Sequence, residues 1–261
     1  MEVFSIAVLL FSFLLLLSLG TPVAWSIIIS SLFTLLVSVP FLPALTTISQ
    51  RMATGIDSFA LLAIPFFILS GELMNKGGVA HRLVAFAKAL VGFLPGGLAL
   101  INVISAMLMG SVAGSAMASA SAMGSILGPE MEKEGYSKGF GVAINITSAT
   151  TGLVIPPSNI LIVYSLASGG ASIAALFLAG YIPGILTGLF LMAVAMIWAK
   201  KKNFKTGKRA PLKTVFSSFV RAFPSLMLLF VVIGGIVSGV FTATEASATV
   251  SYTHLRAHET S

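Results

Sequence analysis

Apolar runs long enough to cross a lipid bilayer dominate this sequence and leave it few ways to fold. A spanning helix needs about 20 apolar residues, and about six segments meet that requirement. They lie near residues 3–20, 23–39, 57–75, 139–166, 172–199 and 214–235. Hydrophobic residues make up 57% of the chain and charged residues only 9%, which excludes an ordinary soluble domain. The sequence therefore predicts an all-α, polytopic membrane protein.

The segment at 139–166 is interrupted by Gly152, by Pro156 and Pro157, and by several hydroxyl and amide side chains. Proline lacks a backbone N–H and clashes with the carbonyl one turn earlier, and lipid cannot satisfy the backbone groups that this frees. In membrane proteins, broken helices of this kind line ion or substrate sites. We therefore expect a broken helix over 139–166 with a functional site at the break.

Residues 97–128 form another apolar run, with small residues from Gly110 to Ser115 at its middle. One interpretation is a re-entrant hairpin, in which half-helices over 97–109 and 116–127 meet at this turn and return to the side they entered from. The alternative is a single tilted span whose Gly, Ala and Ser residues let neighbouring helices approach closely. Hydropathy alone does not distinguish the two.

The placement of Lys and Arg favours the hairpin. If residues 97–128 do not cross, twelve of the fifteen basic residues fall on one face. These are Lys76, Arg82, Lys88, Lys133, Lys138, Lys200, Lys201, Lys202, Lys205, Lys208, Arg209 and Lys213. The positive-inside rule makes that face cytoplasmic and the amino terminus external. Topology and attraction to the lipid bilayer then explain the net charge of +7, and nucleic acid is not an expected partner.

Four motifs, in order along the chain, resemble the large membrane subunit of tripartite ATP-independent periplasmic (TRAP) transporters. They are Gly55 to Met74, the turn from Gly110 to Ser115, the break from Ile155 to Ser158, and Gly239 to Ala246. The resemblance covers residues 1 to about 249. It implies a secondary transporter of the bacterial inner membrane, with an inverted repeat and an elevator-type moving domain. It also implies sodium-coupled uptake of organic acids, a small membrane subunit and a periplasmic substrate-binding protein as partners, and no cofactor besides the sodium ion.

An inverted-repeat transporter builds its midplane site from two hairpins and two broken helices, whereas this sequence contains one of each. We interpret residues 1–199 as the first repeat, with scaffold spans, an interfacial helix at 79–94, the hairpin at 97–128, the broken helix at 139–166 and a span at 172–199. Residues 200–213 are the basic cytoplasmic linker and residues 214–250 begin a second repeat. Residues 251–261 are polar where the family continues with an apolar span, so we interpret them as a non-native tail on a chain truncated at its carboxyl end. We expect these 261 residues alone not to transport.

A sodium site needs several oxygen ligands, most of them neutral. Candidates in the turn and the break are Ser111, Gly114, Ser115, Asn145, Thr147, Ser148, Thr150, Thr151, Gly152, Pro156, Pro157, Ser158 and Asn159. Ser158 and Asn159 follow the Pro pair, where a new half-helix would begin and its amino end would favour an anionic group. The alternative is that these hydroxyls bond to their own helix carbonyls or join neighbouring helices.

Two acidic residues, Asp57 and Glu72, flank the third span, where a carboxylate is expected at the membrane boundary. The neighbouring Gly71 makes Glu72 the stronger functional candidate.

Other functions fit the residues less well. An intramembrane serine hydrolase would need a base beside its nucleophile, and no span contains a His, so we do not expect an enzyme. The absence of Cys excludes disulfides and thiolate chemistry. A sodium-coupled carboxylate carrier without a binding protein, and a structural subunit or channel, remain as alternatives.

Overall fold

The computed structural model describes residues 2–202, 204, 206–207 and 209–259, with side-chain surroundings for residues 3–253 within those ranges. Every regular element in this part of the chain is a helix, which confirms the all-α expectation. Three helical segments are long and apolar enough to cross a membrane: Phe59–Lys76, Ile173–Lys201 and Leu212–Val237. Lys205 and Lys208, which belong to the predicted cytoplasmic charge, lie outside the described residues. The chain forms two compact units that divide between Ser58 and Phe59.

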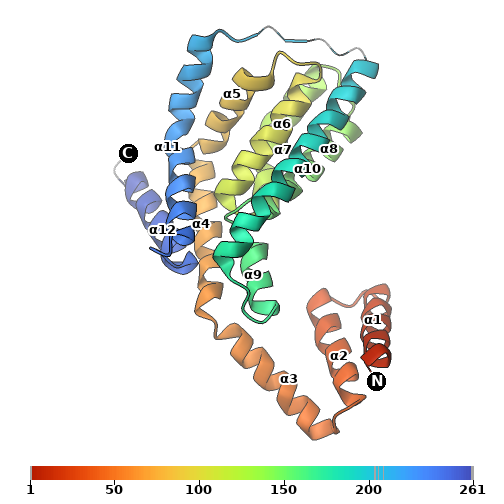
Figure 1. Ribbon diagram of the computed structural model, residues 1–261. Helices are drawn as coiled ribbons and strands as arrows, with labels where there is room; N and C mark the ends of the chain where they lie inside the picture. The colour runs from red at the N-terminus through yellow and green to blue at the C-terminus, as the bar shows by residue number, and fades with distance from the viewer. Residues whose placement is uncertain (1, 203, 205, 208, 260–261) are drawn as a thin grey trace. The chain divides into compact units, whose positions relative to one another are not determined.

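The first unit contains α1 (Glu2–Ser18), α2 (Val23–Leu36) and α3 (Phe41–Ile56). The two apolar helices α1 and α2 lie side by side (Figure 1) and are each shorter than the predicted spans. Their turn is fixed by Thr21, whose hydroxyl oxygen lies 2.8 Å from that of Ser26. Pro40 precedes α3, consistent with the preference for proline at helix starts.

The second unit contains the other elements. It begins with η1 (Phe59–Leu62), α4 (Ala63–Lys76), α5 (Val79–Val91), α6 (Gly97–Ala113) and α7 (Ala116–Lys133). It continues with α8 (Lys138–Ala149), η2 (Thr150–Leu153), α9 (Asn159–Ala167), α10 (Ile173–Lys201), α11 (Leu212–Val237) and α12 (Ala243–Glu259). Figure 1 shows α6 and α7 as an antiparallel pair, while the end of α5, the start of α6, the end of α10 and the start of α11 lie together at one end of the unit.

Two hydrophobic cores hold this unit together. The first lies among α5, α6 and α7, where Leu83, Leu100 and Met123 are almost completely buried. It shows that α5 packs against protein along its apolar face. The interfacial position expected for 79–94 stays a prediction. The second lies among α4, α9, α10, α11 and α12 around Phe67 and Phe177.

Four aromatic rings fix the start of the linker at the basic end. Tyr136 stacks on Phe204 with ring centroids 4.1 Å apart and an interplanar angle of 7°. Phe140 stacks on Trp198 at 3.8 Å and 4°. Burial of the Tyr136 phenol, with a smaller contribution from the charge of Glu134, raises its pKa to about 12. This aromatic cluster ties Phe204 to the end of α10 and to the turn between α7 and α8.

A capping box begins α12. The backbone N–H and hydroxyl of Thr242 donate to Glu245 Oε2 at 2.8 and 2.9 Å, and the Thr242 hydroxyl accepts from the Glu245 N–H at 3.2 Å. These bonds lower the pKa of the Glu245 carboxyl. The motif over 239–246 thus has a local structural role, which is to start a helix.

The helix α12 packs along α4, from which it is distant in the sequence. The Thr244 hydroxyl donates to the Phe59 carbonyl at 3.0 Å, and the Ser251 hydroxyl donates to the Phe66 carbonyl at 2.7 Å. Both donors are buried. The backbone of α12 continues through the predicted tail to Glu259, and the non-native origin of residues 251–261 stays a prediction.

Candidate functional site

The turn between α6 and α7 consists of only Gly114 and Ser115. Gly114 has φ +61°, a left-handed conformation that favours glycine. Ser115 caps α7 by accepting a hydrogen bond from the Ala118 N–H at 3.4 Å. Because so short a turn suffices, α6 extends to Ala113, beyond the half-helix expected over 97–109. At its other end α7 continues to Lys133, beyond the half-helix expected over 116–127.

The break separates α8 from α9. The chain leaves the α-helix at Ala149, makes the short 3-10 helix η2, and resumes helix at Asn159. The peptide between Pro156 and Pro157 is cis, and both prolines are buried. Ser158 caps α9 by accepting from the Leu161 N–H at 3.4 Å.

The turn and the break pack directly against one another. A β-carbon added to Gly110 would lie 2.2 Å from the Cα of Gly152, so the two backbones touch where both residues lack side chains. Beyond this contact in both segments, the Asn159 N–H donates to the Gly114 carbonyl at 3.4 Å. Two segments about 40 residues apart therefore form one continuous backbone surface.

A row of glycines on α10 lies behind this surface. A β-carbon on Gly180 would lie 2.3 Å from the Val154 carbonyl oxygen, and one on Gly184 would lie 2.4 Å from Ile155 Cγ1. Gly188, one turn further, faces the sulfur of Met107 on α6. Spacing of small residues by four places them on one helix face, which allows close helix approach in a membrane. Both the break and α6 thus pack closely against α10.

Four helix ends meet at the junction of turn and break. The carboxyl ends of α6 and η2 bring carbonyl groups, which carry partial negative charge and favour a cation. The amino ends of α7 and α9 bring partial positive charge and favour an anion. The arrangement therefore offers complementary environments for a cation and a carboxylate close together.

The predicted site residues fall into three groups by burial. Ser111, Gly114, Ser148, Thr151, Gly152, Pro156, Pro157 and Ser158 are buried, Ser115, Asn145 and Asn159 are half-buried, and Thr147 and Thr150 are exposed. The exposed hydroxyls donate to carbonyls of their own helix, and so does the fully buried Thr151, to Ser148 at 2.6 Å. Donating its proton leaves the lone pairs of a hydroxyl available, so the bond of Thr151 does not prevent it from binding a cation.

One polar atom at the junction has no partner. Within the described residues, Asn159 Oδ1 is buried and accepts no hydrogen bond. It lies 3.6 Å from the position of a β-carbon on Gly114. A buried, unpaired acceptor costs about 1–3 kcal/mol, so this oxygen is suited to a ligand that supplies positive charge.

A second polar cluster lies closer to the basic end and was missed by sequence reasoning, apart from Asn145 and Ser148. Asn102 on α6 lies with its Oδ1 2.9 Å from the Ser148 hydroxyl and its Nδ2 3.5 Å from Asn145 Oδ1. Asn145 also donates to the Ala120 carbonyl at 2.8 Å, which ties α8 to α7. Ser105, one turn after Asn102, is fully buried with no hydrogen bond within the described residues. Sequence reasoning could have found Asn102, because it is the only amide side chain in the mostly apolar run at 97–113.

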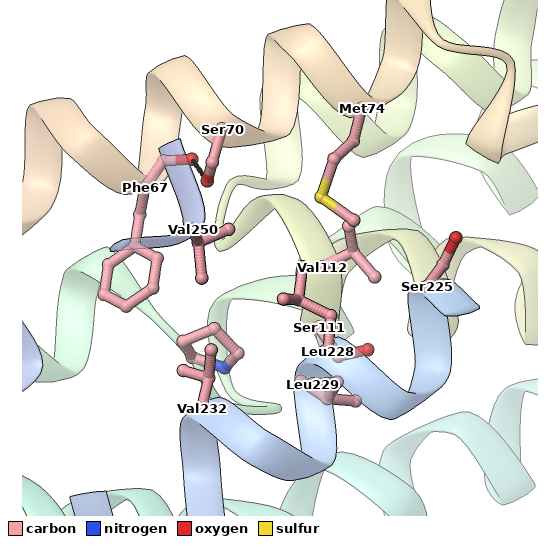
Figure 2. A pocket seen from close by; sticks show the side chains of 11 residues that line it. Phe67, Ser70, Met74, Ser111, Val112, Ser225, Leu228, Leu229, Val232 and Val250 are labelled. Carbon is pink, nitrogen blue, oxygen red and sulfur yellow. Dashed lines mark hydrogen bonds between the residues drawn. The ribbon is translucent and has the colours of Figure 1, made fainter. Parts of the chain in front are cut away.

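A small cavity lies on the other side of the turn. Figure 2 shows Ser111 and Val112 of α6 facing Ser70 and Met74 of α4, with α11 and Val250 of α12 closing the space. Its volume of about 20 Å³ can hold about one water molecule. Its lining is mostly apolar and includes Pro157 of the break. Beside it α4 packs directly on the end of α6, since a β-carbon added to Gly71 would lie 2.8 Å from the Cα of Ala113.

The two acidic residues that flank the third span are both exposed. Neither Asp57 nor Glu72 makes an ion pair within the described residues. Their exposure is compatible with the boundary placement expected from the sequence.

Comparison with known proteins agrees with the motifs. The family model described as "Tripartite ATP-independent periplasmic transporter, DctM component" matches residues 10–255, slightly beyond the resemblance over 1–249. The uncharacterized protein YgiK of Salmonella typhimurium is 54% identical over 94% of this chain and 57% of its own length. The large permease protein DctM of a C4-dicarboxylate TRAP transporter from Rhodobacter capsulatus is 38% identical over 93% of this chain and 58% of its own.

A third relative, the large permease protein SiaM of a sialic acid TRAP transporter from Vibrio cholerae, is 39% identical over 93% of this chain and 56% of its own. The chain thus spans a little over half the length of these relatives. It belongs to the DctM family, the large membrane permease components of TRAP transporters, and not to a family of enzymes.

Proposed function

We propose that the full-length protein imports organic acids across the bacterial inner membrane and couples their uptake to sodium entry. Its proposed partners are a small membrane subunit and a periplasmic binding protein that delivers the substrate. Family membership supports the transport role, and two of the relatives are named for C4-dicarboxylates and sialic acid, both of them acids.

The observation that carries the proposal is the junction of turn and break. Gly110 touches Gly152, the Asn159 N–H meets the Gly114 carbonyl, and the unpaired Asn159 Oδ1 lies beside them. Sodium would bind here to carbonyl and hydroxyl oxygens, Thr151 among them, which replace its lost water. The amino ends of α7 and α9 would face a substrate carboxylate, whose charge the cation balances.

Uptake by proteoliposomes tests this proposal. The full-length gene product, with its small subunit and binding protein, should accumulate a radiolabelled organic acid under an inward sodium gradient and not under a potassium gradient. Thr151→Ala should raise the sodium concentration for half-maximal uptake about tenfold, since one hydrogen-bonding or ligand contact contributes about 1–1.5 kcal/mol. Ser115→Ala should act in the same direction. The matched control is Thr187→Ala, an exposed α10 hydroxyl that donates to the Pro183 carbonyl at 2.7 Å.

Unchanged sodium dependence in both Thr151→Ala and Ser115→Ala would return these hydroxyls to a structural role. The second candidate function is a sodium-coupled carboxylate carrier that needs no binding protein. Equal uptake with and without the soluble protein would favour that candidate.

A further inference from the structure

A large cavity lies at the basic end of the second unit, away from the junction of turn and break. Its volume of about 810 Å³ is within the range of about 300–1,000 Å³ typical of small-ligand sites. It is bounded by α5, by the start of α6, by the end of α7, by the start of α11 and by the linker. None of the candidate transport residues lines it.

The linker covers this cavity through three described contacts. Gly207 passes so close to α5 that an added β-carbon would lie 2.4 Å from the Gly92 carbonyl oxygen. The Arg209 guanidinium lies over the Phe93 ring at 5.5 Å. Phe204 is held by its stack on Tyr136. The linker that covers the cavity is therefore held at the end of α5 on one side and at the turn between α7 and α8 on the other.

The polar lining carries both signs of charge. Lys88 and Lys133 line the cavity together with Glu134, and the hydroxyls of Thr214 and Ser218 lie on the α11 side. Lys88 also pairs with Glu130 at 3.5 Å. Two lysines and one lining carboxylate suit a singly charged anion better than a polyphosphate, which the carboxylate would repel.

The inner part of the cavity is apolar and includes a helix start. Leu98 and Ile101 of α6 are almost completely buried beneath it. The first residues of α6 line the cavity, and no side chain caps their backbone N–H groups. The cavity thus combines an apolar inner surface with lysines and uncapped backbone N–H groups at the start of α6. This combination suits an amphiphile with an anionic head group.

We propose that this cavity binds the phosphodiester headgroup of a membrane phospholipid, with the phosphate between Lys88 and Lys133 and the glycerol and upper acyl chain over Leu98 and Ile101. The site is independent of the proposed transport function. Bound lipid would fill the space between α5, α6 and the linker and hold the linker in place.

Titration of the detergent-purified full-length protein with phosphatidylglycerol, followed by thermal unfolding, tests the site. Phosphatidylglycerol should raise the unfolding temperature saturably, whereas diacylglycerol, which lacks phosphate, should not. The double variant Lys88→Gln/Lys133→Gln should weaken binding about tenfold, because it removes both cations beside the phosphate. The matched control, Lys76→Gln/Lys138→Gln, removes the same charge outside the cavity and one surface ion pair, since Lys138 pairs with Glu132 at 3.9 Å.

Two further variants separate loss of the site from loss of the fold. Lys88→Arg/Lys133→Arg should retain binding, and Thr214→Phe should reduce binding without changing charge by filling the cavity from α11. Binding of soluble glycerophosphoglycerol, which carries the same singly charged phosphodiester without acyl chains, with the same lysine dependence would support the phosphate site and assign it to a soluble ester in place of lipid. Equal weakening by the Lys76/Lys138 control, or lipid binding unaffected by Lys88→Gln/Lys133→Gln and by Thr214→Phe, would overturn the proposal.

Discussion

Gly110 and Gly152 lie backbone against backbone, so closely that a β-carbon on either residue would come within 2.6 Å of the other residue's Cα. The contact joins the last turn of α6 to the helix break and leaves no room for any other residue type at either position. The geometry of the candidate site depends on this contact.

Gly110→Ala should therefore destabilise the protein by about 1–3 kcal/mol, because the backbones must separate to admit the methyl group. Gly128→Ala on α7 is the matched control, since nothing lies within 4 Å of its added β-carbon. We expect that control to be neutral or slightly stabilising. Unfolding of the purified variants monitored by size-exclusion chromatography after heating measures both, and equal stability would contradict the contact.

Asn145→Ala should also be destabilising, by about 1–3 kcal/mol, because it removes the bond to the Ala120 carbonyl and leaves Asn102 with one partner fewer. Asn75→Ala on α4 makes the same chemical change at a side chain that has no hydrogen bond within the described residues. Its effect should stay within about 0.5 kcal/mol. A similar loss of stability in both variants would show that the polar cluster contributes nothing specific.

Tyr136 should make the folded protein less stable at high pH. Its folded-state pKa of about 12 exceeds the ordinary value of 10.0, so above pH 10 the unfolded chain loses this proton first. Stability should be unaffected by this group below about pH 9 and should fall as the pH rises from 10 towards 12. The difference between the wild type and Tyr136→Phe in alkaline unfolding isolates the effect from the titration of lysines. A difference that does not change between pH 9 and 11.5 would contradict the raised pKa.

Single cysteines can report topology cleanly, because the native chain has none. Ser168→Cys, in the exposed turn between α9 and α10, should react with a membrane-impermeant maleimide added outside cells. Ser137→Cys and Thr206→Cys, both exposed, should react only after permeabilisation, because the predicted topology returns the hairpin to the cytoplasmic face. Labelling of Thr206→Cys in intact cells would reverse the assignment.

Sequence reasoning located the two interruptions of the helices because Gly and Pro act locally. The Pro156–Pro157 pair cannot continue an ordinary helix, so the break could be predicted without any knowledge of packing. Gly114 could also be helical, and the turn was predicted from the small residues around it together with the placement of Lys and Arg. Helix lengths were less accurate, since Ser111 and Val112 can be helical or not, and the packing of α6 against its neighbours decides. For the same reason, the sequence could not show which of the candidate ligand residues are buried.

Long-range contacts were beyond the reach of the sequence. Nothing local distinguishes the exposed Thr150 from the buried Thr151, because the difference depends on which side of η2 faces α6. The pairing of Gly110 with Gly152 and of Asn102 with Ser148 likewise requires the three-dimensional arrangement. Topology, repeat symmetry and sodium binding stay predictions for the experiments above.

The stacking of Trp198 on Phe140 gives the protein a native optical probe. The chain has only two tryptophans, and Trp25 lies in the first unit, so Trp25→Phe would leave a single emitter beside the linker. Its emission wavelength and quenching would respond to any separation of the linker from the end of α10. Movement at the basic end could then be followed in real time without attaching a dye.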